Sequence, residues 1–447
     1  MKVLSFLRGE TFARGIHPPQ HKSTADRSIR RLPFPGRLTV PLSQHIGKPS
    51  KALVRVGQEV VRGEPIAAAD GWLSVPHHAP ASGVVEAIDL RPSARGPWTE
   101  AIVIRVHEAS TQEVLWGEPQ DPDTMERDAI VRAVQASGMV GLGGAAFPTH
   151  AKLAVPKEAK VHTLLVNGCE CEPYLTCDHR VMVEHAADLV AGTRYAMRAV
   201  GAERAIIGVE DNKPEAAAAI RRVLPVDDSI AVEEVPTKYP QGSEKMLIMS
   251  LFGVEIPSGR LPLALGIVVN NVGTLAALGK LLPAGEGLIE RVVTVAGPGV
   301  ARPGDYRVPI GTPVSFVLDY AGAPAAARQL VLGGPMMGQS VASLDVPVTK
   351  GVSGLLVFAG EELTRREHLR TFPCIKCGEC VESCPMGLNP STLGMLAGKR
   401  EYEAMAERYH LGDCFECGCC TYVCPSNIPL VQQFRIAKAV LRERAAA

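Results

Sequence analysis

The sequence predicts a multidomain chain of mixed α/β and α+β character. Short strand-like runs fill residues 30–105, strand-like and helical segments alternate between residues 121 and 285, and a doubled cysteine motif lies near the C-terminus. A chain of 447 residues is long enough for roughly two to four domains. We expect an arm over residues 1–29, a β domain over 30–120, an α/β domain over 121–285, a compact α+β module over 286–359 and a cysteine-rich helical domain over 360–447.

The composition is that of a soluble globular protein, with 46% hydrophobic and 21% charged residues. The most apolar stretch, residues 261–282, is interrupted by Asn270 and Asn271, so we expect no membrane span. The apolar run at the N-terminus is too short for a signal peptide. Nine of the twelve cysteines lie in the cysteine-rich region and nothing indicates oxidised pairing, which favours a reducing compartment, the cytoplasm.

Charge is unevenly distributed although the net charge is zero. Residues 1–62 carry twelve Lys or Arg against three acidic residues, a local charge of +9 that the remainder of the chain balances. Such a segment is either a solvated basic surface or one that meets an anionic membrane leaflet or an acidic partner. Nucleic acid is the least favoured partner, because no aromatic residues interleave the charges and the total charge is neutral.

The N-terminal third predicts an extended arm followed by a small all-β module. Residues 15–29 are rich in turn formers, and residues 30–105 contain short β-type runs separated by Gly and Pro. Two of these runs, VRVGQEVVRGEPIA and HAPASGVVEAI, resemble the halves of a lipoyl- or biotinyl-type barrel sandwich. Carrier domains of that type need a lysine at the hairpin tip, where this chain has His77, His78 and Ala79. We interpret the module as a docking or structural domain.

The middle of the chain predicts an α/β domain with a largely parallel sheet. We expect helices at 123–136 (capped by Asp121 or Asp123), 179–200 and 214–224, and strands at 161–166, 204–210 and 230–235. Residues 291–335 are β-rich around a helical turn at 314–320, and helices are expected at 391–409 and 428–445.

Each cysteine motif has the spacing C-x2-C-x2-C-x3-C-P. In two-cluster ferredoxins the first three thiolates of such a motif bind one [4Fe–4S] cluster and the fourth binds the other. We therefore assign Cys374, Cys377, Cys380 and Cys424 to cluster 1, and Cys414, Cys417, Cys420 and Cys384 to cluster 2. Zinc ribbons use two pairs of ligands and disulfide frameworks belong to small secreted chains, which disfavours both alternatives.

Cys419 remains outside this scheme, and we expect it to fill space beside a cluster. The helix-forming insert between the motifs favours an α-helical two-cluster ferredoxin domain, of the type found in electron-transfer subunits.

A glycine-rich segment provides the second chemical signal. Gly141, Gly143 and Gly144 with Ala146 fit the pattern G-x-G-x-x-A, but a predicted helix rather than a strand precedes them. This excludes an ordinary Rossmann fingerprint, which follows a strand and opens a helix. The segment is either a plain turn or backbone that closely approaches a flat or phosphorylated ligand.

Polar residues near predicted strand ends favour the ligand interpretation. Glu170 and Glu172 follow one strand, Asn270 and Asn271 follow another, and Lys152 ends the glycine-rich segment. Taken singly, the lysine is a solvated charge and the asparagines form a turn. Beside a two-cluster module they indicate a redox organic cofactor, and a flavin is the one that converts a hydride into single electrons.

With these motifs in view, the chain resembles the RnfC family, the C subunits of Rnf-type electron-transport complexes, over nearly its whole length. The stretches that carry the resemblance are GIHPPQHK at 15–22, GLGGAAFPTHAKL at 141–153, NGCECEPYLTCDHR at 167–180 and both cysteine motifs. The middle domain is also similar to the flavin-carrying subunit of respiratory complex I. The positions that match its motifs are Gly141, Gly143, Gly144, Phe147, Lys152, Asn167, Glu170, Glu172, Pro173, Tyr239, Gly242, Glu244, Val269, Asn270, Asn271, Val272 and Thr274. Cys169 and Ser243 replace two acids of that pattern.

The resemblance implies a lipoyl-like barrel sandwich, a complex-I-flavoprotein-like domain, a small β-grasp-like (SLBB) domain and the ferredoxin domain. It implies noncovalent FMN, NAD(H) and two [4Fe–4S] clusters as cofactors. The FMN and nucleotide contacts it implies are Gly141, Gly143, Gly144, Phe147, Lys152, Asn167, Glu170, Glu172, Tyr239, Glu244, Asn270, Asn271 and Thr274. Among these, Phe147 would shape the pocket, Lys152 would stabilise anionic reduced flavin, and the glutamates would orient flavin or nucleotide.

The resemblance further implies a peripheral subunit on the cytoplasmic side of the cell inner membrane. Its partners would be the other subunits of the complex and, through one of them, a ferredoxin-type electron donor. Ion translocation would reside in the integral subunits. Two alternatives remain: a flavin and iron–sulfur cobalamin reductase of a microcompartment, and a docking scaffold with a vestigial flavin pocket.

Overall fold

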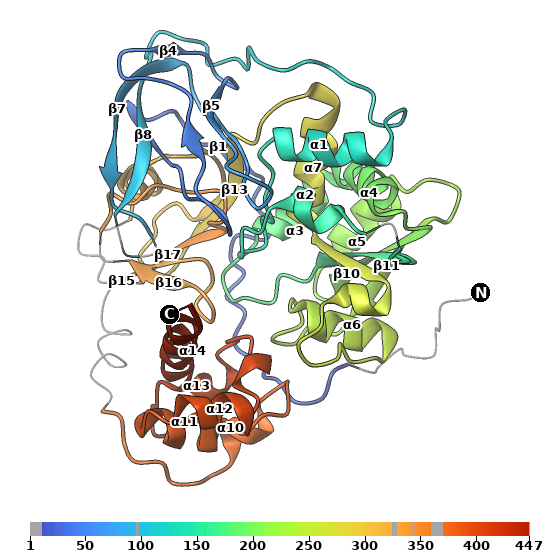
Figure 1. Cartoon of the computed structure of the whole chain (residues 1–447), viewed down its shortest axis with the longest axis vertical. Coiled ribbons are helices and arrows are strands. Elements are labelled where there is room, and N and C mark those ends of the chain that lie inside the picture. The colour runs from blue at the N-terminus through green and yellow to red at the C-terminus, as the bar shows by residue number, and fades with distance from the viewer. Residues whose placement is uncertain are drawn as a thin grey trace.

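The computed structural model describes residues 11–446 except 95, 97, 157, 324–328, 342 and 359–369. Figure 1 shows a strand-rich N-terminal part, an α/β part, a second sheet and a helical C-terminal part. Residues 1–10 of the predicted arm, with most of the apolar N-terminal run, and the predicted start of the C-terminal domain at 360–369 lie outside the described residues.

Residues 11–29 form an extended arm that links separate parts of the chain. The Gly15 amide donates to the Ser383 carbonyl (3.2 Å), and Ile16 forms an isolated antiparallel bridge with Tyr239. The Tyr174 amide donates to the Gln20 carbonyl at 2.8 Å. The arm therefore lies between the α/β part and the C-terminal helices, as the blue trace in Figure 1 shows.

Several basic residues of the N-terminal segment pair within the chain. Arg37 pairs with Glu86 at 2.6 Å, and Arg62 pairs with Glu290 at 2.6 Å although its side chain is only 6% exposed. These internal pairs reduce the basic surface that the sequence predicts.

The N-terminal β domain is a sandwich of two small antiparallel sheets. Its strands are β2 (Arg37–Pro41), β3 (Lys51–Ala52), β4 (Glu59–Val60), β5 (Pro65–Ala68), β6 (His77–His78), β7 (Gly83–Arg91) and β8 (Thr99–Val106). The sheets have the orders β2-β8-β7-β4 and β3-β5-β6, and they enclose Val40, Ile66, Ile102 and Ile104. The predicted barrel-sandwich architecture is confirmed.

The prediction that His77 and His78 lie at a hairpin tip is wrong. Both lie in β6, paired with β5, and are 1% and 7% exposed. The Nε2 atom of His77 lies within hydrogen-bond distance of Ser50 Oγ (3.1 Å) and the Leu42 carbonyl (3.2 Å). Burial lowers the pKa of both imidazoles, which are core groups rather than a substitute for a carrier lysine.

The α/β domain is built on a four-stranded, fully parallel sheet in the order β11-β10-β9-β12. Its strands are β9 (Thr163–Gly168), β10 (Arg204–Glu210), β11 (Ile230–Val235) and β12 (Ile267–Asn271). Its helices are α1 (Arg127–Ala136), α2 (Thr149–Leu153), α3 (Cys177–Glu184), α4 (Ala186–Val200), α5 (Pro214–Arg221), α6 (Glu244–Phe252), η2 (Pro262–Leu265) and α7 (Val272–Ala284). Asn167 at the end of β9 lies in register with Asn271 at the end of β12, which brings two predicted site residues to one sheet edge.

Helix α1 begins later than the sequence predicts. Its N-cap is Glu126, and the predicted caps Asp121 and Asp123 are wrong. The Asp121 carboxylate instead accepts from the Asp123 amide (3.1 Å) in a turn before the helix, so this side chain stabilises the turn and does not cap α1.

The SLBB part is a six-stranded mixed sheet in the order β1-β14-β13-β17-β15-β16. Its elements are β1 (Arg30–Arg31), β13 (Glu290–Ala296), β14 (Gly304–Pro309), α8 (Val314–Ala321), β15 (Gln329–Leu332), β16 (Gln339–Val341) and β17 (Gly354–Phe358). Strand β1 was expected in the barrel domain but pairs in parallel with β14. The following residue, Leu32, is fully buried in the SLBB core, which draws the strand into this sheet.

The C-terminal part consists of several short helices and one long helix, α14, around Leu393, Met405, Leu411 and Phe434. They are α10 (Glu379–Glu382), α11 (Pro390–Gly398), α12 (Tyr402–Glu407), η3 (Leu411–Asp413), α13 (Cys419–Tyr422) and α14 (Leu430–Ala446). The helical segment predicted at 391–409 is two helices, because Arg400 between them adopts a left-handed conformation (φ 60°).

Candidate functional site

A cavity of about 890 Å³ lies where the four parts of the chain meet. Its wall includes Gln44 of the β domain, Met337 of the SLBB part and Phe415 of the C-terminal part. All the residues predicted to contact FMN or nucleotide line it: Gly141, Gly143, Gly144, Phe147, Lys152, Asn167, Glu170, Glu172, Tyr239, Glu244, Asn270, Asn271 and Thr274. Residues spread over more than 130 positions thus converge on one space large enough for a ligand.

The glycine-rich segment forms a loop between α1 and α2. A bridge between Val140 and Pro148 closes it, and the Gly141 amide donates to the Phe147 carbonyl (2.8 Å). A Cβ atom at Gly143 would lie 3.2–3.3 Å from the Asn271 side chain, and Gly144 has a φ of +125°. The glycines therefore expose backbone to the cavity at positions that side chains would obstruct.

Strand β12 and helix α7 place three polar residues at the cavity wall. The Asn271 carboxamide caps α7 by accepting from the Thr274 amide at 3.1 Å. Thr274 is fully buried, and its hydroxyl accepts from the Leu142 amide (2.8 Å), so it fixes the glycine loop. Asn270 differs: its Nδ2 atom is buried and has no hydrogen-bond partner in the described part of the chain. A buried amide donor without a partner at a cavity wall fits a ligand acceptor.

The loop after β9 is ordered by its own carboxylates. Glu170 is 6% exposed, and its carboxylate accepts from the Asp178 amide (2.9 Å) and the His179 amide (3.2 Å) at the start of α3. The Glu172 carboxylate accepts from the Met336 amide (3.0 Å) and the Met337 amide (2.9 Å) of the SLBB part. Both glutamates thus hold backbone in addition to lining the cavity.

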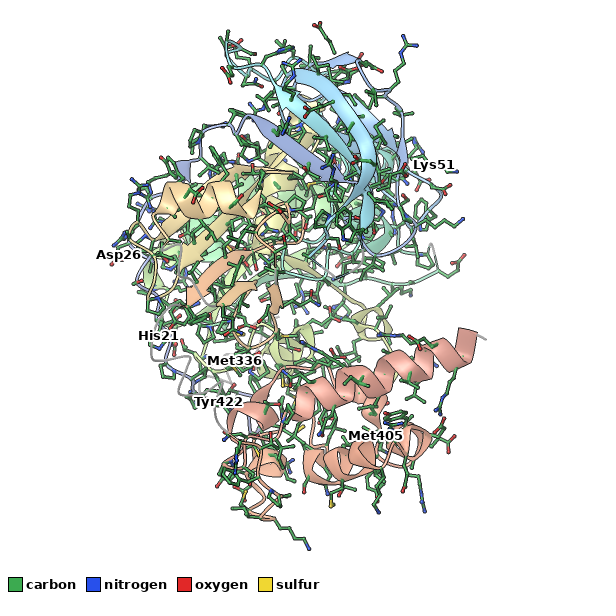
Figure 2. The ribbon with its side chains drawn as sticks, turned by 90° about the vertical axis from the view of Figure 1, so that its left-hand side faces the viewer. His21, Asp26, Lys51, Met336, Met405 and Tyr422 are labelled. Atoms are coloured by element: carbon green, nitrogen blue, oxygen red, sulfur yellow. The ribbon has the colours of Figure 1, made fainter. Side chains whose placement is uncertain are left out.

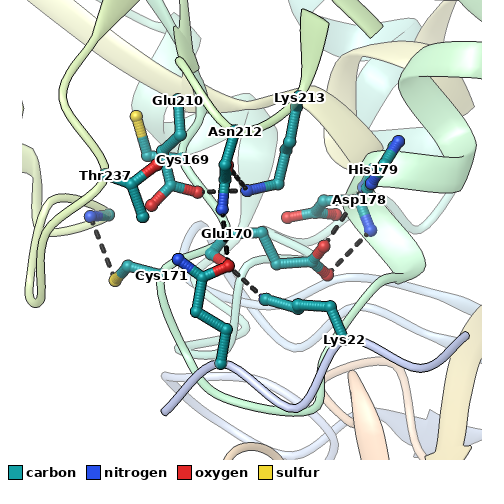
Figure 3. Close-up of polar contacts among 12 residues, drawn as sticks. Lys22, Cys169, Glu170, Cys171, Asp178, His179, Glu210, Asn212, Lys213 and Thr237 are labelled. Carbon is teal, nitrogen blue, oxygen red and sulfur yellow. Dashed lines mark hydrogen bonds and ion pairs between the residues drawn. The ribbon is translucent and has the colours of Figure 1, made fainter. Parts of the chain in front are cut away.

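The Lys22 side chain of the arm binds this loop (Figure 3). Its ammonium donates to three carbonyls, of Glu170 (2.7 Å), Glu172 (2.8 Å) and Leu175 (2.5 Å). Burial lowers its pKa, while the charge of Glu170 acts in the opposite direction. Nothing local in the sequence marked this lysine as buried, and only its place in the stretch GIHPPQHK singled it out.

A buried ion pair between Glu210 and Lys213 lies beside Lys22 and Cys169. Burial raises the pKa of the Cys169 thiol well above its usual value, with the charge of Glu210 acting in the same direction. The acid of the complex I pattern is therefore replaced by a neutral group. Ser243, the second departure, occupies the N-cap position of α6.

Two charged pairs lie farther out on the cavity wall. Lys152 Nζ lies 3.8 Å from Glu244 Oε2, with both side chains 38% exposed. On the side of the C-terminal part, Arg435 pairs with Glu416 at 3.1 Å. These pairs leave cationic groups available to an anionic ligand.

The two cysteine motifs adopt the same local structure. The amides of Lys376 and Glu416 lie 3.4 Å from the sulfur of Cys374 and Cys414, respectively, and both residues have positive φ angles. Gly378 and Gly418 then begin the short helices α10 and α13, each with a φ of +86°. Backbone turns of this kind aim amides at sulfur and wrap thiols around a shared centre.

Cysteines of the two motifs lie beside one another. Burial raises the pKa of Cys380, and the neighbouring Cys377, Cys424 and Cys374 raise it further. Burial also raises the pKa of Cys414 to about 11, and the neighbouring Cys417 and Cys384 act in the same direction. Cys384, Cys414, Cys417 and Cys420 line one small cavity together with apolar side chains. Cys419 lines the same pocket. Thiols that converge in an apolar pocket fit the binding of an iron–sulfur cluster.

The second motif lies close to the large cavity and the first faces outward. Tyr239 lines the cavity, is buried, and its hydroxyl donates to the Cys417 carbonyl at 2.6 Å. Cys374 and Cys377 are exposed. Cys419 is fully buried in an apolar cluster with Ile16 and Tyr239, in agreement with a space-filling role.

Four family models match consecutive parts of the chain. They are the RnfC barrel sandwich hybrid domain (residues 10–109), the Nuo51 FMN-binding domain (134–280), the SLBB domain (292–340) and the 4Fe-4S dicluster domain (373–428). The predicted fold class and the order of its parts are confirmed, as are FMN and iron–sulfur clusters as cofactors.

Proteins of two bacteria resemble the chain over most of their own length. The C subunit of the "Proton-translocating ferredoxin:NAD(+) oxidoreductase complex" of Clostridium ljungdahlii is 39% identical over 90% of this chain and 87% of that protein. The C subunit of the "Ion-translocating oxidoreductase complex" of Rhodobacter capsulatus is 41% identical over 98% of this chain and 84% of that protein. This chain belongs to the RnfC family, the C subunits of ion-translocating oxidoreductase complexes.

Members of this family differ in length. The RnfC-type protein of Edwardsiella ictaluri is 40% identical over 99% of this chain, which spans only 55% of that protein. Among solved structures, the NAD+-reducing [NiFe]-hydrogenase in the air-oxidized state has a TM-score of 0.52 at 21% identity. That likeness covers 74% of this chain and 70% of the hydrogenase chain, and it shows a shared fold. None of the helices in the described residues has the length and hydrophobicity needed to cross a bilayer.

Proposed function

We propose that this chain is the peripheral subunit of a membrane-bound ferredoxin:NAD oxidoreductase complex at which NAD(H) exchanges hydride with FMN. Two [4Fe–4S] clusters relay single electrons between that site and partner subunits. The observation that carries the proposal is the large cavity, which gathers every predicted cofactor contact and reaches the backbone of the second cysteine motif.

The cavity wall supplies the contacts that FMN needs. Bound FMN converts a two-electron hydride into single electrons. The loop at Gly143 and Gly144 admits a ligand close to the backbone, Asn270 offers a buried donor, and Lys152 offers a positive charge. Lys22, Glu170 and Glu172 act on the ligand indirectly, by holding the loop that forms the cavity floor.

The same geometry supports an order for the two clusters relative to the cavity. Phe415 and Glu416, within the second motif, line the large cavity, so the cluster held by Cys384, Cys414, Cys417 and Cys420 is the proximal one. The exposed thiols of Cys374 and Cys377 support a position of the other cluster at the surface, from which electrons pass to a partner.

Membership of the family supports a setting for the chain. We propose that the chain docks on the cytoplasmic side of the inner membrane, that a partner subunit supplies electrons from ferredoxin, and that ion translocation occurs in other subunits. A cobalamin reductase is disfavoured because the barrel domain precedes the clusters. A scaffold with a vestigial pocket is disfavoured by the open cavity and its unpartnered Asn270 amide.

The proposal is tested by isolating the chain without oxygen and measuring FMN, iron and bleaching of the flavin by NADH. The variant Lys152→Gln removes the charge at the cavity and is expected to weaken FMN binding by about 10- to 100-fold, the value of one charge-assisted hydrogen bond. The control Lys245→Gln removes a nearby lysine that pairs with Asp413 (3.9 Å) and does not line the cavity.

Lys245→Gln should retain FMN at the wild-type level. A wild-type chain that binds iron but no FMN, or that holds FMN which NADH does not reduce, would contradict the proposed function. Equal loss of FMN in both variants would show that Lys152 acts through general stability.

A further inference from the structure

A second cavity, of about 70 Å³, lies behind the wall of the large one, among α3, α7 and β13. Cys177 and Asp178 line both cavities. The carboxylates of Glu170 and Asp178 and the thiol of Cys177 approach one another within 4.8 Å at this wall. A titratable side chain therefore forms the partition between the two spaces.

The carboxylate of Asp178 reaches both sides of the partition. Its Oδ2 atom accepts from Asn271 Nδ2 at 2.7 Å, and Asn271 lines only the large cavity of the two. Its Oδ1 atom lies 3.0 Å from where a Cβ atom at Gly273 would be, and Gly273 lines only the small cavity of the two. The missing side chain at Gly273 leaves this oxygen open to the small cavity.

We propose that Asp178 is a proton relay, which accepts the proton set free when electrons leave the large cavity and releases it to solvent through the small one. This inference rests on the proposed function. Oxidation of NADH yields NAD+, one proton and two electrons. Each cluster accepts one electron and no proton, so the proton must leave by another route. FMN and nucleotide would displace water from the large cavity, and a titratable group in its wall then provides that route.

The charges around Asp178 suit a group that binds and releases a proton. Burial raises its pKa to about 7, the charge of Glu170 acts in the same direction, and the Asn271 hydrogen bond, Arg291 and Lys22 oppose them. Cys177 beside it is held neutral, because burial raises the pKa of its thiol. A pKa near the working pH is optimal for proton transfer.

The small cavity continues from Asp178 to the surface. His185 Nδ1 lies 3.2 Å from Asp188 Oδ2, and these two side chains of the cavity wall are 28% and 37% exposed. Lys280, Arg291 and Arg307 are the cations of the same wall, and Glu290 is a further acid on it. Arg307 lies 2.8 Å from His185 Nε2. A proton released by Asp178 thus meets polar groups that end in solvent.

The test uses the full chain with its flavin and clusters, isolated without oxygen. The flavin midpoint potential is measured against pH by spectroelectrochemistry, and reoxidation of the NADH-reduced chain is timed with ferricyanide, a one-electron acceptor. The wild-type plot of potential against pH should show a break near pH 7. Asp178→Asn should lose the break and slow reoxidation by about 10²-fold, while reduction by NADH is retained.

Asp305→Asn is the matched control. Burial raises the pKa of Asp305 to about 7 as well, but its carboxylate binds Thr176 and Thr294 and lines neither cavity. Asp305→Asn should keep the break in the plot of potential against pH and the wild-type rate of reoxidation. Gly273→Ala keeps Asp178 and crowds its Oδ1 atom, so it should slow reoxidation and preserve the break in the plot of potential against pH. If Asp178→Asn does not fold, Gly273→Ala provides the test.

The outcomes separate the two proposals. Wild-type behaviour of both Asp178→Asn and Gly273→Ala, in a chain that binds FMN and is reduced by NADH, overturns the relay alone. A wild-type chain without FMN overturns the relay together with the proposed function.

Discussion

Single lysines hold the site together by donating to backbone carbonyls. Lys350 of the SLBB part is 1% exposed, and its amino group donates to the carbonyls of Gly138 (2.7 Å) and Pro76 (3.0 Å). It thereby joins the start of the glycine loop to the β domain. Burial lowers its pKa to about 7. A neutral amine carries two N–H donors, which match the two carbonyls, whereas an ammonium has a third donor.

The depressed pKa of Lys350 predicts a pH dependence of stability. The pKa of Lys350 in the folded chain, about 7, lies below the ordinary lysine pKa of 10.5. The stability linked to this group is therefore complete above pH 10.5, falls as the pH is lowered from 10.5 to 7, and is lost below pH 7. From pH 7 towards pH 10, the free energy of unfolding of the wild type should gain about 1.4 kcal/mol per pH unit relative to Lys350→Met. Urea denaturation at several pH values measures this difference. Lys51→Met, at an exposed lysine that pairs with Asp70, should show no such trend, and parallel curves for Lys350→Met would refute the expectation.

Residues of the site differ in how far sequence could predict them. Gly143, Lys152 and Asn270 lie in motifs whose spacing marks them, and all line the cavity. Lys22 and Lys350 carry no local signal, because their carbonyl partners lie 148–153 and 212–274 positions away in the chain. A lysine pattern alone predicts solvent exposure, and only tertiary structure reveals three carbonyls that face a buried amine.

At the scale of elements, the packing of α4 on α7 positions the cavity wall. A Cβ atom at Gly192 of α4 would lie 1.9 Å from the Leu275 carbonyl, and one at Gly279 of α7 would lie 1.9 Å from the Asp188 carbonyl. The helices therefore touch backbone to backbone. Because α7 starts directly after Asn271, the depth of this contact sets where Asn271 meets the cavity.

Gly279→Ala should force α4 and α7 apart. Overpacking of this kind costs about 1–3 kcal/mol, so we expect a lower free energy of unfolding together with weaker FMN retention. Gly398→Ala is the matched control, because it changes a glycine at the end of α11 with no atom within 4 Å of the new methyl group. The control should be neutral or slightly stabilising. Thermal unfolding and FMN content of the two variants test this, and equal behaviour would show that the close contact is dispensable.

The elements themselves were largely predictable, since continuous apolar runs mark β9 and β10 and Pro214 marks the start of α5. The sequence predictions of element boundaries were wrong where the local sequence favoured one structure and tertiary contacts or backbone conformation imposed another. Strand β1 follows its buried neighbour Leu32 into the SLBB sheet, and the left-handed backbone at Arg400 divides a segment whose composition favours one helix.

At the scale of the whole molecule, the fold joins a two-electron site to one-electron carriers through contacts between distant parts. Tyr239 of the α/β part donates to the Cys417 carbonyl, and Arg435 of α14 donates to the Met337 carbonyl (3.2 Å). Figure 2 shows Met336 at this junction, between the SLBB sheet and the C-terminal helices. Sequence motifs identified each part but contained nothing on which faces meet, so only the structure shows that the second cysteine motif reaches the cavity.

That order and the interleaved ligands predict which cluster each cysteine supports. Cys384→Ala lies in the first motif but should remove the cluster of the second, and Cys424→Ala should do the reverse, each leaving about four of eight irons. Because we propose that the second-motif cluster is proximal to the cavity, NADH should reduce the surviving cluster in Cys424→Ala and fail to reduce it rapidly in Cys384→Ala. Iron analysis and electron paramagnetic resonance after mixing with NADH distinguish the variants.

Cys419→Ala is the control that should keep both clusters, since Cys419 packs with Ile16 and Tyr239. If each substitution removed the cluster of its own motif, the interleaved assignment would be wrong.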